Sequence, residues 1–477
     1  MSGQISISIW LFLVLIIIAT VAILDRILIP STRWFLRRRI NRVLDEIGTR
    51  LDIEIRPFQL TKRQVLIDRL AYDPEVIDAI KVYAKQHDMP QEIVQKKVID
   101  YAREIIPSFN AYLYFRIGYW IAKRIARLLY RVRVGLMNEA YYTSIDPDST
   151  VVFVMNHRSN MDYILVAFLA AERTTLSYAV GEWAKIWPLH MLIRAMGAFF
   201  VRRNSGNPLY RKVLERYIHM ATREGVCQAV FLEGGLSRDV RLQKPKLGLV
   251  DYMLRHYDPE RDRDVVFIPV GINYDRTIED RSLLRTLEPQ VKKRSGWFVF
   301  RTTAGFILRS MVLVVLSRWR RYGYACVNFG RPHSAKVYCR KHQVNFSALG
   351  RADRFKAVEK LCRQIMRGVA DVIPILPVSV VSKIFLESKR KPMSINDIEA
   401  RGNRLMEELG AKGAPVFETP RSTRAHAIVD AVDFMMLRRV IQSLEERFQT
   451  IPEEEAILQY YANAMAHWWQ RTDGSNS

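Results

Sequence analysis

The sequence predicts an α/β fold: a mixed, largely parallel sheet flanked by helices, with an N-terminal transmembrane helix and additional N- and C-terminal helical regions. Three observations support this fold class. Short runs of β-branched and aromatic residues recur over residues 140–335, helix-like segments separate the first three runs, and the chain opens on a long apolar segment. Strands that alternate with helices are typical of parallel sheets, because a parallel connection needs a crossover.

The N-terminal segment predicts a membrane anchor. Residues 5–24, ISISIWLFLVLIIIATVAIL, carry no charge over 20 residues, enough for a helix to cross a hydrocarbon core of roughly 30 Å. Six arginines follow this run and no basic residue precedes it, which places the body of the chain on the cytoplasmic side. These arginines are Arg26, Arg33, Arg37, Arg38, Arg39 and Arg42. We expect a cell-membrane protein with a single-pass anchor over 1–25; a cleaved or interfacial segment is the alternative.

Two helical segments follow the expected anchor. Residues 26–108 predict a charged helical region, punctuated by Pro74, Pro90 and Pro107. Residues 109–134 interleave aromatic and aliphatic side chains with arginines and lysines at helical spacing. Such a helix either lies in a membrane interface or packs on the domain core with its basic face in water, and the sequence leaves both open.

The predicted α/β region spans residues 109–335. Its expected strands are TVVFVM (150–155), AVFLE (229–233), VVFIPVGI (265–272) and YACVNFG (324–330). In such a sheet, ligands bind at the carboxyl ends of the strands, where the polar residues of interest occur. The apolar stretch 303–317 is short for a membrane crossing and predicts a buried or interfacial helix. Residues 336–477 predict a C-terminal helical region.

Charge and cysteine content limit the partners. The chain has 73 lysines and arginines against 49 aspartates and glutamates, a net charge of +24, which favours anionic lipids, phosphates or nucleic acid. No zinc-finger spacing or recognition-helix motif supports nucleic acid. The four cysteines have neither metal-site nor disulfide spacing, so we expect free thiols and no metal. They are Cys227, Cys326, Cys339 and Cys362.

The stretch NHRSNMD places His157 and Asp162 after the first expected strand. With His157 in the loop and Asp162 in the first turns of the next helix, the carboxylate can accept a hydrogen bond from one ring nitrogen and leave the other to take a proton. The ordinary alternative is a polar turn. Ser159 lies nearby, but the chain lacks a G-x-S-x-G elbow, so such a base would act on a hydroxyl of the substrate.

Two later stretches suggest anion binding. GAFFVRRN ends in Arg202 and Arg203, which can hold a phosphate or form a basic surface turn. In FLEGGLSR, the expected strand ends at Glu233, and Gly234 and Gly235 let the backbone turn sharply and approach a ligand. Donors and positive charge follow at Ser237, Arg238, Lys244 and Lys246. A fourth polar strand end, IPVGINYD, would pass alone as a strand and turn.

Together the four stretches NHRSNMD, GAFFVRR, FLEGGLSR and IPVGINYD, in this order, resemble the glycerolipid acyltransferase family. More closely, the chain resembles the membrane glycerol-3-phosphate acyltransferases and their dihydroxyacetone-phosphate acyltransferase relatives, over roughly residues 106–470. The resemblance implies that His157 is the general base and that Asp162 orients it. It implies a substrate-binding set of Arg202, Arg203, Glu233, Gly234, Gly235, Ser237, Arg238 and Lys246.

The resemblance implies a membrane-bound O-acyltransferase. It would transfer a fatty acyl group from acyl-CoA or acyl carrier protein to the sn-1 hydroxyl of glycerol 3-phosphate, giving lysophosphatidate for phospholipid synthesis. Membrane lipids are expected partners, and no cofactor, metal or nucleic acid is expected. The alternatives are acylation of lysophosphatidate or dihydroxyacetone phosphate and, more distantly, a non-enzymatic basic binder of anionic lipid or nucleic acid.

One departure leaves the acceptor open. The family's third block usually carries an arginine where this sequence has Leu236, and an aliphatic side chain cannot bind phosphate. Either Arg238, Lys246 or the Arg202–Arg203 pair supplies the missing charge, or the acceptor differs from glycerol 3-phosphate.

Overall fold

The computed structural model describes residues 56–135, 138–170, 175–181, 189–202, 205–285, 305, 322–417 and 424–470. The predicted anchor over 1–25 lies outside these residues, as do Arg203 and the 303–317 segment apart from Gly305. Among the helices of the described ranges, none is both long enough and apolar enough to span a bilayer.

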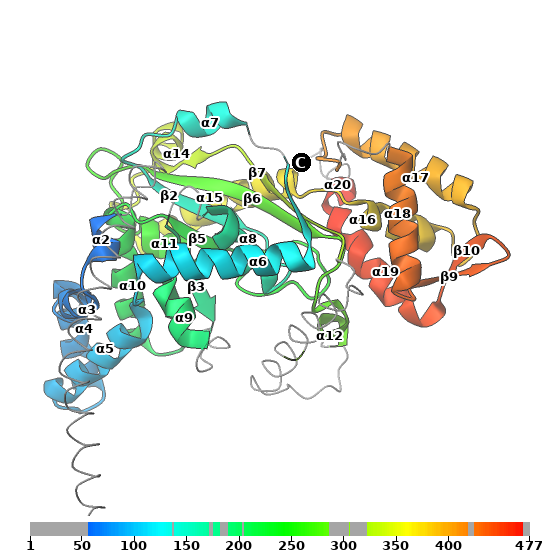
Figure 1. Ribbon diagram of the computed structural model, residues 1–477. Coiled ribbons are helices and arrows are strands. Elements are labelled where there is room, and N and C mark those ends of the chain that lie inside the picture. Colours follow the sequence, from blue (N-terminus) through cyan, green and yellow to red (C-terminus); the bar gives the residue numbers. More distant parts are fainter. Residues whose placement is uncertain are drawn as a thin grey trace, which may run out of the picture.

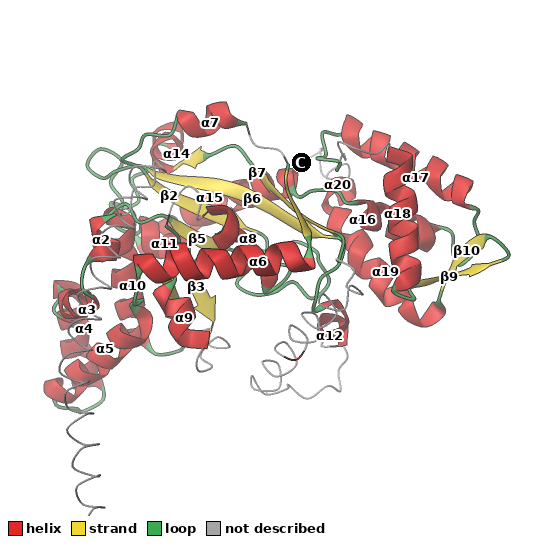
Figure 2. Cartoon of the chain, viewed as in Figure 1, coloured by secondary structure: helices red, strands yellow, loops and turns green. Residues whose placement is uncertain are grey.

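A mixed sheet lies at the centre of the molecule (Figures 1 and 2). Its strands run in the order β1-β7-β6-β2-β5-β3-β4, and β8 adds to β6. Neighbouring strands are parallel except where β7 and β8 pair antiparallel with β6, so the predicted largely parallel sheet is confirmed. The strands are β1 (Arg131–Val134), β2 (Thr150–Met155), β3 (Ser177–Gly181), β4 (Ala198–Val201), β5 (Gln228–Phe231), β6 (Val265–Tyr274), β7 (Tyr324–Phe329) and β8 (His333–Ser334).

The predicted helix over 109–134 is wrong at its end. A π-helical turn, η1 (Leu113–Gly118), continues into α6 (Tyr119–Leu129), after which Tyr130 turns the backbone extended. Residues 131–134 then form β1, which pairs in parallel with β7. The sequence RVRV suits an edge strand, because β-branched residues alternate with exposed arginines.

The N-terminal helices belong to the core on one face of the sheet. α2 (Pro57–Leu60), α3 (Arg63–Ala71), α4 (Pro74–Gln86) and α5 (Gln91–Ile105) share a core with four later helices. These later helices are α10 (Pro208–Arg223), α11 (Gly248–Leu254), α14 (Ala335–His342) and α15 (Arg351–Val372). The expected C-terminal region therefore contributes its first two helices to the sheet core.

Proline and capping residues start several of the helices. Pro74 takes the first position of α4, and the Asp73 carboxylate accepts from the Glu75 N–H at 3.0 Å. α10 begins in the same way, with Pro208 after the cap Asn207. A proline is tolerated at this position because its missing N–H would have no partner there.

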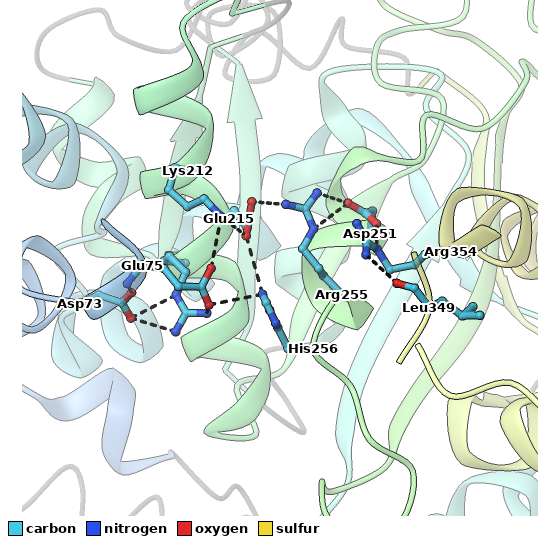
Figure 3. Close-up of polar contacts among 10 residues, drawn as sticks. Asp73, Glu75, Lys212, Glu215, Asp251, Arg255, His256, Leu349 and Arg354 are labelled. Carbon is cyan, nitrogen blue, oxygen red and sulfur yellow. Dashed lines mark hydrogen bonds and ion pairs between the residues drawn. The ribbon is translucent and has the colours of Figure 1, made fainter. Parts of the chain in front are cut away.

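An ion-pair network ties α4 to α10 (Figure 3). Lys212 lies 3.2 Å from Glu75 and 2.9 Å from Glu215, and Arg216 pairs with Glu75 and Asp73. Glu75, Glu215 and His256 also offer three ligand atoms within 4.8 Å of one another, a geometry compatible with a metal ion. Both carboxylates are already neutralised by lysine and arginine, so we interpret this group as a structural network.

The other face of the sheet packs against α6 and α8 (Met161–Ala170), which contact each other along their lengths. α7 (Glu139–Thr143), α9 (Leu189–Ala195) and α12 (Asp280–Arg285) are short helices at the borders of this layer. The loop 156–160 joins β2 to α8. The packing of α8 in this layer therefore fixes where that loop ends.

The C-terminal helices form a second body with its own core. In Figure 1 they stand beside the sheet, in dark yellow, orange and red. They are α16 (Pro377–Glu387), α17 (Ile395–Ala411), α18 (Arg424–Leu437), α19 (Glu455–Ala462) and α20 (His467–Gln470), with the hairpin β9 (Ile441–Leu444) and β10 (Arg447–Thr450). Short 3-10 turns, η3 (Pro452–Glu454) and η4 (Asn463–Met465), flank α19.

Candidate active site

The loop that carries His157 begins where Asn156 ends the pairing of β2 with β6. The Asn156 side chain takes the place of a backbone unit: its amide donates to the Ile272 carbonyl at 2.9 Å and its oxygen accepts from the Ile272 N–H at 2.8 Å. The main chain is therefore free to leave the sheet one residue later, at His157.

His157 and Asp162 form a buried hydrogen-bonded pair. Nδ1 of His157 lies 2.9 Å from Oδ2 of Asp162, and the two residues are 1% and 0% exposed. Asp162 lies in the first turn of α8, so the predicted hydrogen bond between loop and helix is confirmed. A carboxylate acceptor places the imidazole proton on Nδ1 and leaves Nε2 as the basic nitrogen.

Asp162 accepts more than the histidine bond. Oδ2 also accepts the backbone N–H groups of Arg158 at 2.7 Å and Ser159 at 3.1 Å. Oδ1 accepts the hydroxyl of Tyr274, which lies on β6, at 2.6 Å. Four donors therefore fix the carboxylate in one orientation toward His157.

Two aromatic rings hold the imidazole plane. The His157 ring stacks on Phe231 with centroids 4.0 Å apart, and the Tyr163 ring meets it edge-on at 5.3 Å. Phe231 is the last residue of β5, and Tyr163 lies in α8. These two contacts restrict rotation of the ring away from Asp162.

Glu233 and Ser237 bind the main chain of His157 from the third predicted block. The His157 N–H donates to the Glu233 carboxylate at 3.3 Å, and the Ser237 N–H donates to the His157 carbonyl at 2.9 Å. Burial raises the pKa of Glu233 to about 7, although the nearby Arg158 charge acts to lower it. Between them, Gly234 has a φ of +71°, a left-handed conformation that favours glycine.

Two residues of this site, buried Arg158 and half-buried Glu279, lie outside the predicted catalytic and substrate-binding sets. Arg158, 2% exposed, donates to the Asn273 side chain at 3.3 Å. Glu279 accepts the Ser159 hydroxyl at 2.7 Å and both the backbone and side-chain N–H groups of Asn160 at 3.2 and 3.1 Å. Burial raises the pKa of Glu279. The sequence signal for Glu279 was weak, because it is one acidic residue in a charged stretch after β6.

The predicted phosphate-binding residues do not gather at one point. Arg202 follows β4, three strands from β2 in the sheet, or roughly 14 Å at ordinary strand spacing. Its guanidinium pairs with Glu104 of α5 at 2.6 Å, and this hydrogen-bonded pair raises the pKa of Arg202. Arg238 and Lys246 are exposed on the loop after β5, where no side-chain hydrogen bond or ion pair to a described residue holds either one.

The position that breaks the family pattern faces the C-terminal body. Leu236 is half-buried against the core of α16 to α19. The Asn463 amide donates to the Asp239 carbonyl of the same loop at 3.0 Å. The loop thus hydrogen-bonds to the backbone of His157 through Glu233 and Ser237. It contacts the C-terminal body through the apolar side chain of Leu236 and the carbonyl of Asp239.

Comparisons with known proteins identify two family matches along the chain. One family model, Acyltransferase, matches residues 138–273, and another, Glycerol-3-phosphate acyltransferase C-terminal region, matches residues 310–470. Together the two matches cover more than half of the chain. The chain belongs to the glycerol-3-phosphate acyltransferase family.

Curated members of the glycerol-3-phosphate acyltransferase family align with most of this chain. The glycerol-3-phosphate acyltransferase of Xanthomonas axonopodis pv. citri is 26% identical over 442 residues, 90% of this chain and 48% of that protein. The one of Pseudomonas aeruginosa is 26% identical over 445 residues, 90% of this chain and 51% of that protein. The chain therefore spans about half the length of the curated relatives it matches.

A solved structure matches more distantly. The crystal structure of the 1-acyl-sn-glycerophosphate acyltransferase from Thermotoga maritima gives a TM-score of 0.29 and 17% identity, covering 65% of this chain and 97% of that chain.

Proposed function

We propose that this chain is a membrane-bound O-acyltransferase that moves a fatty acyl group from acyl-CoA or acyl carrier protein to the sn-1 hydroxyl of glycerol 3-phosphate, giving lysophosphatidate. The observation that carries the proposal is the buried His157–Asp162 pair at the end of β2, in a chain of this family. The reaction needs no cofactor beyond the acyl donor and no metal ion. Localisation at the cell membrane, with the body on the cytoplasmic side, belongs to the same proposal.

His157 acts as the general base. The acceptor hydroxyl lies against Nε2, which takes its proton as the oxygen attacks the thioester carbonyl carbon. Asp162 stabilises the imidazolium that forms. The tetrahedral intermediate then collapses, the carbon–sulfur bond breaks, and His157 returns the proton to the leaving thiolate. A new ester replaces the thioester, and the protein forms no acyl intermediate.

The negative charge that develops on the carbonyl oxygen requires a hydrogen-bond donor. Most backbone N–H groups near His157 are already bonded, those of Arg158 and Ser159 to Asp162 and that of Gly234 to the Phe231 carbonyl. The Gly235 N–H makes no such bond within the described ranges. Of the backbone N–H groups without such a bond, we assign that of Gly235 to the oxyanion, because it directly follows the left-handed turn at Gly234.

Arg238 and Lys246 are the cations that we assign to the acceptor phosphate. Both lie exposed on the loop that bonds to the backbone of His157, without a competing carboxylate among the described residues. Arg202 would have to leave Glu104 to contribute, and Leu236 faces the C-terminal core. The loop cations thus offer a replacement for the family's missing arginine.

The exposed face of α6 supports the membrane part of the proposal. Trp120 is 63% exposed, Ile117 of the preceding turn η1 is 36% exposed, and Arg124 and Arg127 are exposed at helical spacing from them. Apolar and basic side chains together fit a bilayer surface with anionic head groups. α6 packs on α8, the helix of Asp162, so this contact would bring the site close to its lipid product.

The test is an acceptor panel. Membranes that contain the full chain are incubated with labelled acyl-CoA or acyl carrier protein and one acceptor: glycerol 3-phosphate, dihydroxyacetone phosphate or lysophosphatidate. We expect lysophosphatidate from glycerol 3-phosphate, identified by mass spectrometry. His157→Ala should reduce turnover roughly a hundredfold or more, because general-base catalysis contributes at least that much.

The control and the opposing outcomes are distinct. His342→Ala, on α14, should leave turnover unchanged. Phosphatidate or acyl-dihydroxyacetone phosphate as the only product would move the proposal to another acceptor. Near-wild-type turnover of His157→Ala would disprove the mechanism, and no product from any acceptor would favour a lipid-binding protein.

A further inference from the structure

Among the described residues, Tyr274 makes the one hydrogen bond to Asp162 that comes from a neighbouring strand. Its hydroxyl reaches Oδ1 at 2.6 Å, whereas the other three donors, His157, Arg158 and Ser159, all bond to Oδ2 and all belong to the loop beside Asp162. With the three loop bonds alone, the carboxylate could still rotate about Oδ2, because its other oxygen would not be held. A bond at Oδ1 from the rigid sheet removes that freedom.

The sheet fixes Tyr274 itself. It is the last residue of β6, paired antiparallel with Ala325 of β7, and it is 1% exposed. Its ring packs against Tyr130 with centroids 5.2 Å apart, and its backbone N–H donates to the Asn273 side chain at 3.0 Å. Burial and the Asp162 charge raise its pKa well above the usual value, so the hydroxyl stays a donor at neutral pH.

We propose that Tyr274 is a positioning residue for acyl transfer, which holds Asp162 so that His157 keeps its Nδ1 proton and presents Nε2 to the acceptor hydroxyl. The inference rests on the function proposed above. It extends the pair to a Tyr274–Asp162–His157 chain that joins two neighbouring strands, β6 and β2. Tyr274 touches neither substrate nor the reacting atoms.

Tyr274→Phe tests this role, because it removes the hydroxyl and leaves the ring. A hydrogen bond to a charged group is worth about 1.5–3 kcal/mol, so kcat should fall roughly tenfold to a hundredfold. The KM values of acyl donor and acceptor should change little. The acid limb of the kcat/KM profile should move to higher pH, because the carboxylate then shares its charge with fewer donors and holds a proton on the imidazole more strongly.

Tyr130→Phe is the matched control. Tyr130 is equally buried, and its hydroxyl donates to the Arg276 carbonyl at 2.7 Å rather than to Asp162. This variant loses a buried hydrogen bond of similar length, so it reports the cost of that loss to stability. The acid limb of its kcat/KM profile should stay in place. Its melting temperature shows whether a general loss of stability explains the Tyr274→Phe result.

A double-mutant cycle separates action through Asp162 from independent action. In an Asp162→Ala background, Tyr274→Phe should lower the residual kcat by less than twofold, because the carboxylate it holds is gone. A full additional loss there, or a Tyr274→Phe enzyme with wild-type kcat and an unshifted acid limb, would overturn the inference. An inactive wild-type protein would instead refute the proposed function, so the two failures are distinguishable.

Discussion

At the scale of single residues, the geometry assigns different tasks to the charges around His157. Three carboxylates hold the loop in place: Asp162 and Glu233, which are buried, and Glu279, which is half-buried. Exposed cations, Arg238 and Lys246, remain available for a phosphate. Carboxylates that only position the base are thus buried or half-buried, and cations that would bind the acceptor phosphate face solvent.

Arg238→Ala tests the assignment of the phosphate. We expect the KM for the acceptor to rise roughly tenfold or more, because a charge-assisted hydrogen bond to phosphate is lost, while the KM for the acyl donor changes little. Steady-state kinetics with each substrate varied in turn measures both values. Arg261→Ala, an exposed arginine with only a 4.0 Å ion pair, is the control. Equal effects of Arg238→Ala on both KM values would place the phosphate elsewhere.

The raised pKa of Glu233 predicts that the free energy of unfolding depends on pH. Its pKa is raised from 4.5 to about 7 in the folded protein, so the folded state holds a proton that the unfolded chain releases at lower pH. The stabilisation from Glu233 is therefore complete below about pH 4.5 and is lost as pH rises toward 7, with at most about 3 kcal/mol at stake.

Glu233→Gln should flatten this decline. Thermal unfolding at pH 5, 6 and 7 measures it, and the difference in melting temperature between variant and wild type should grow with pH in favour of the variant. Asp275→Asn provides a comparison, since burial also raises the pKa of Asp275 to about 7 at a position bonded to Tyr324 instead of the His157 loop. Parallel pH curves for wild type and Glu233→Gln would contradict the assignment.

At the scale of elements, α18 and α19 are bound to the segment after β6 by buried polar contacts. Arg438 forms an ion pair with Asp280, and the Tyr461 hydroxyl donates to Asp280 at 2.6 Å. The Thr277 N–H donates to the same hydroxyl at 3.1 Å. The C-terminal helices therefore hold both ends of the short segment that contains Glu279.

Asp280→Asn should destabilise the protein strongly. It leaves the Arg438 guanidinium, 7% exposed, without its charged partner, a change that typically costs about 3–5 kcal/mol. Thermal unfolding measures the loss. Glu359→Gln removes an exposed i,i+4 pair with Arg363 on α15 and should cost under about 1 kcal/mol. Similar shifts in melting temperature for the two variants would show that the buried ion pair stabilises the protein no more than the exposed pair does.

The sequence predicted elements where the pattern was local. β2, β5, β6 and β7 were expected within a few residues, because their apolar runs are continuous. β3 and β4 were missed: they are four or five residues long, and their pairing depends on β5, which is distant in sequence. The His157–Asp162 contact was predictable from five residues of chain. The contacts of Glu279, Arg158 and Tyr274 join segments more than 110 residues apart, and no local pattern specifies them.

At the scale of the whole molecule, the sheet joins two helical bodies. The N-terminal helices share a core with one of its faces and are tied down by the Glu75, Lys212 and Glu215 network (Figure 3). The C-terminal helices keep their own core and contact the loop after β5 and the segment after β6. The candidate site lies at the carboxyl edge of the sheet, where these loops meet.

The packing of Leu236 has a consequence for how such proteins can be recombined. Its side chain belongs to the C-terminal core, while its neighbours Glu233 and Ser237 bond to the backbone of His157. An arginine grafted there to imitate a relative would bring a charge against apolar side chains. A chimera that exchanges the C-terminal helices between two relatives therefore has to exchange residue 236 with them, since that position matches the helices it packs against.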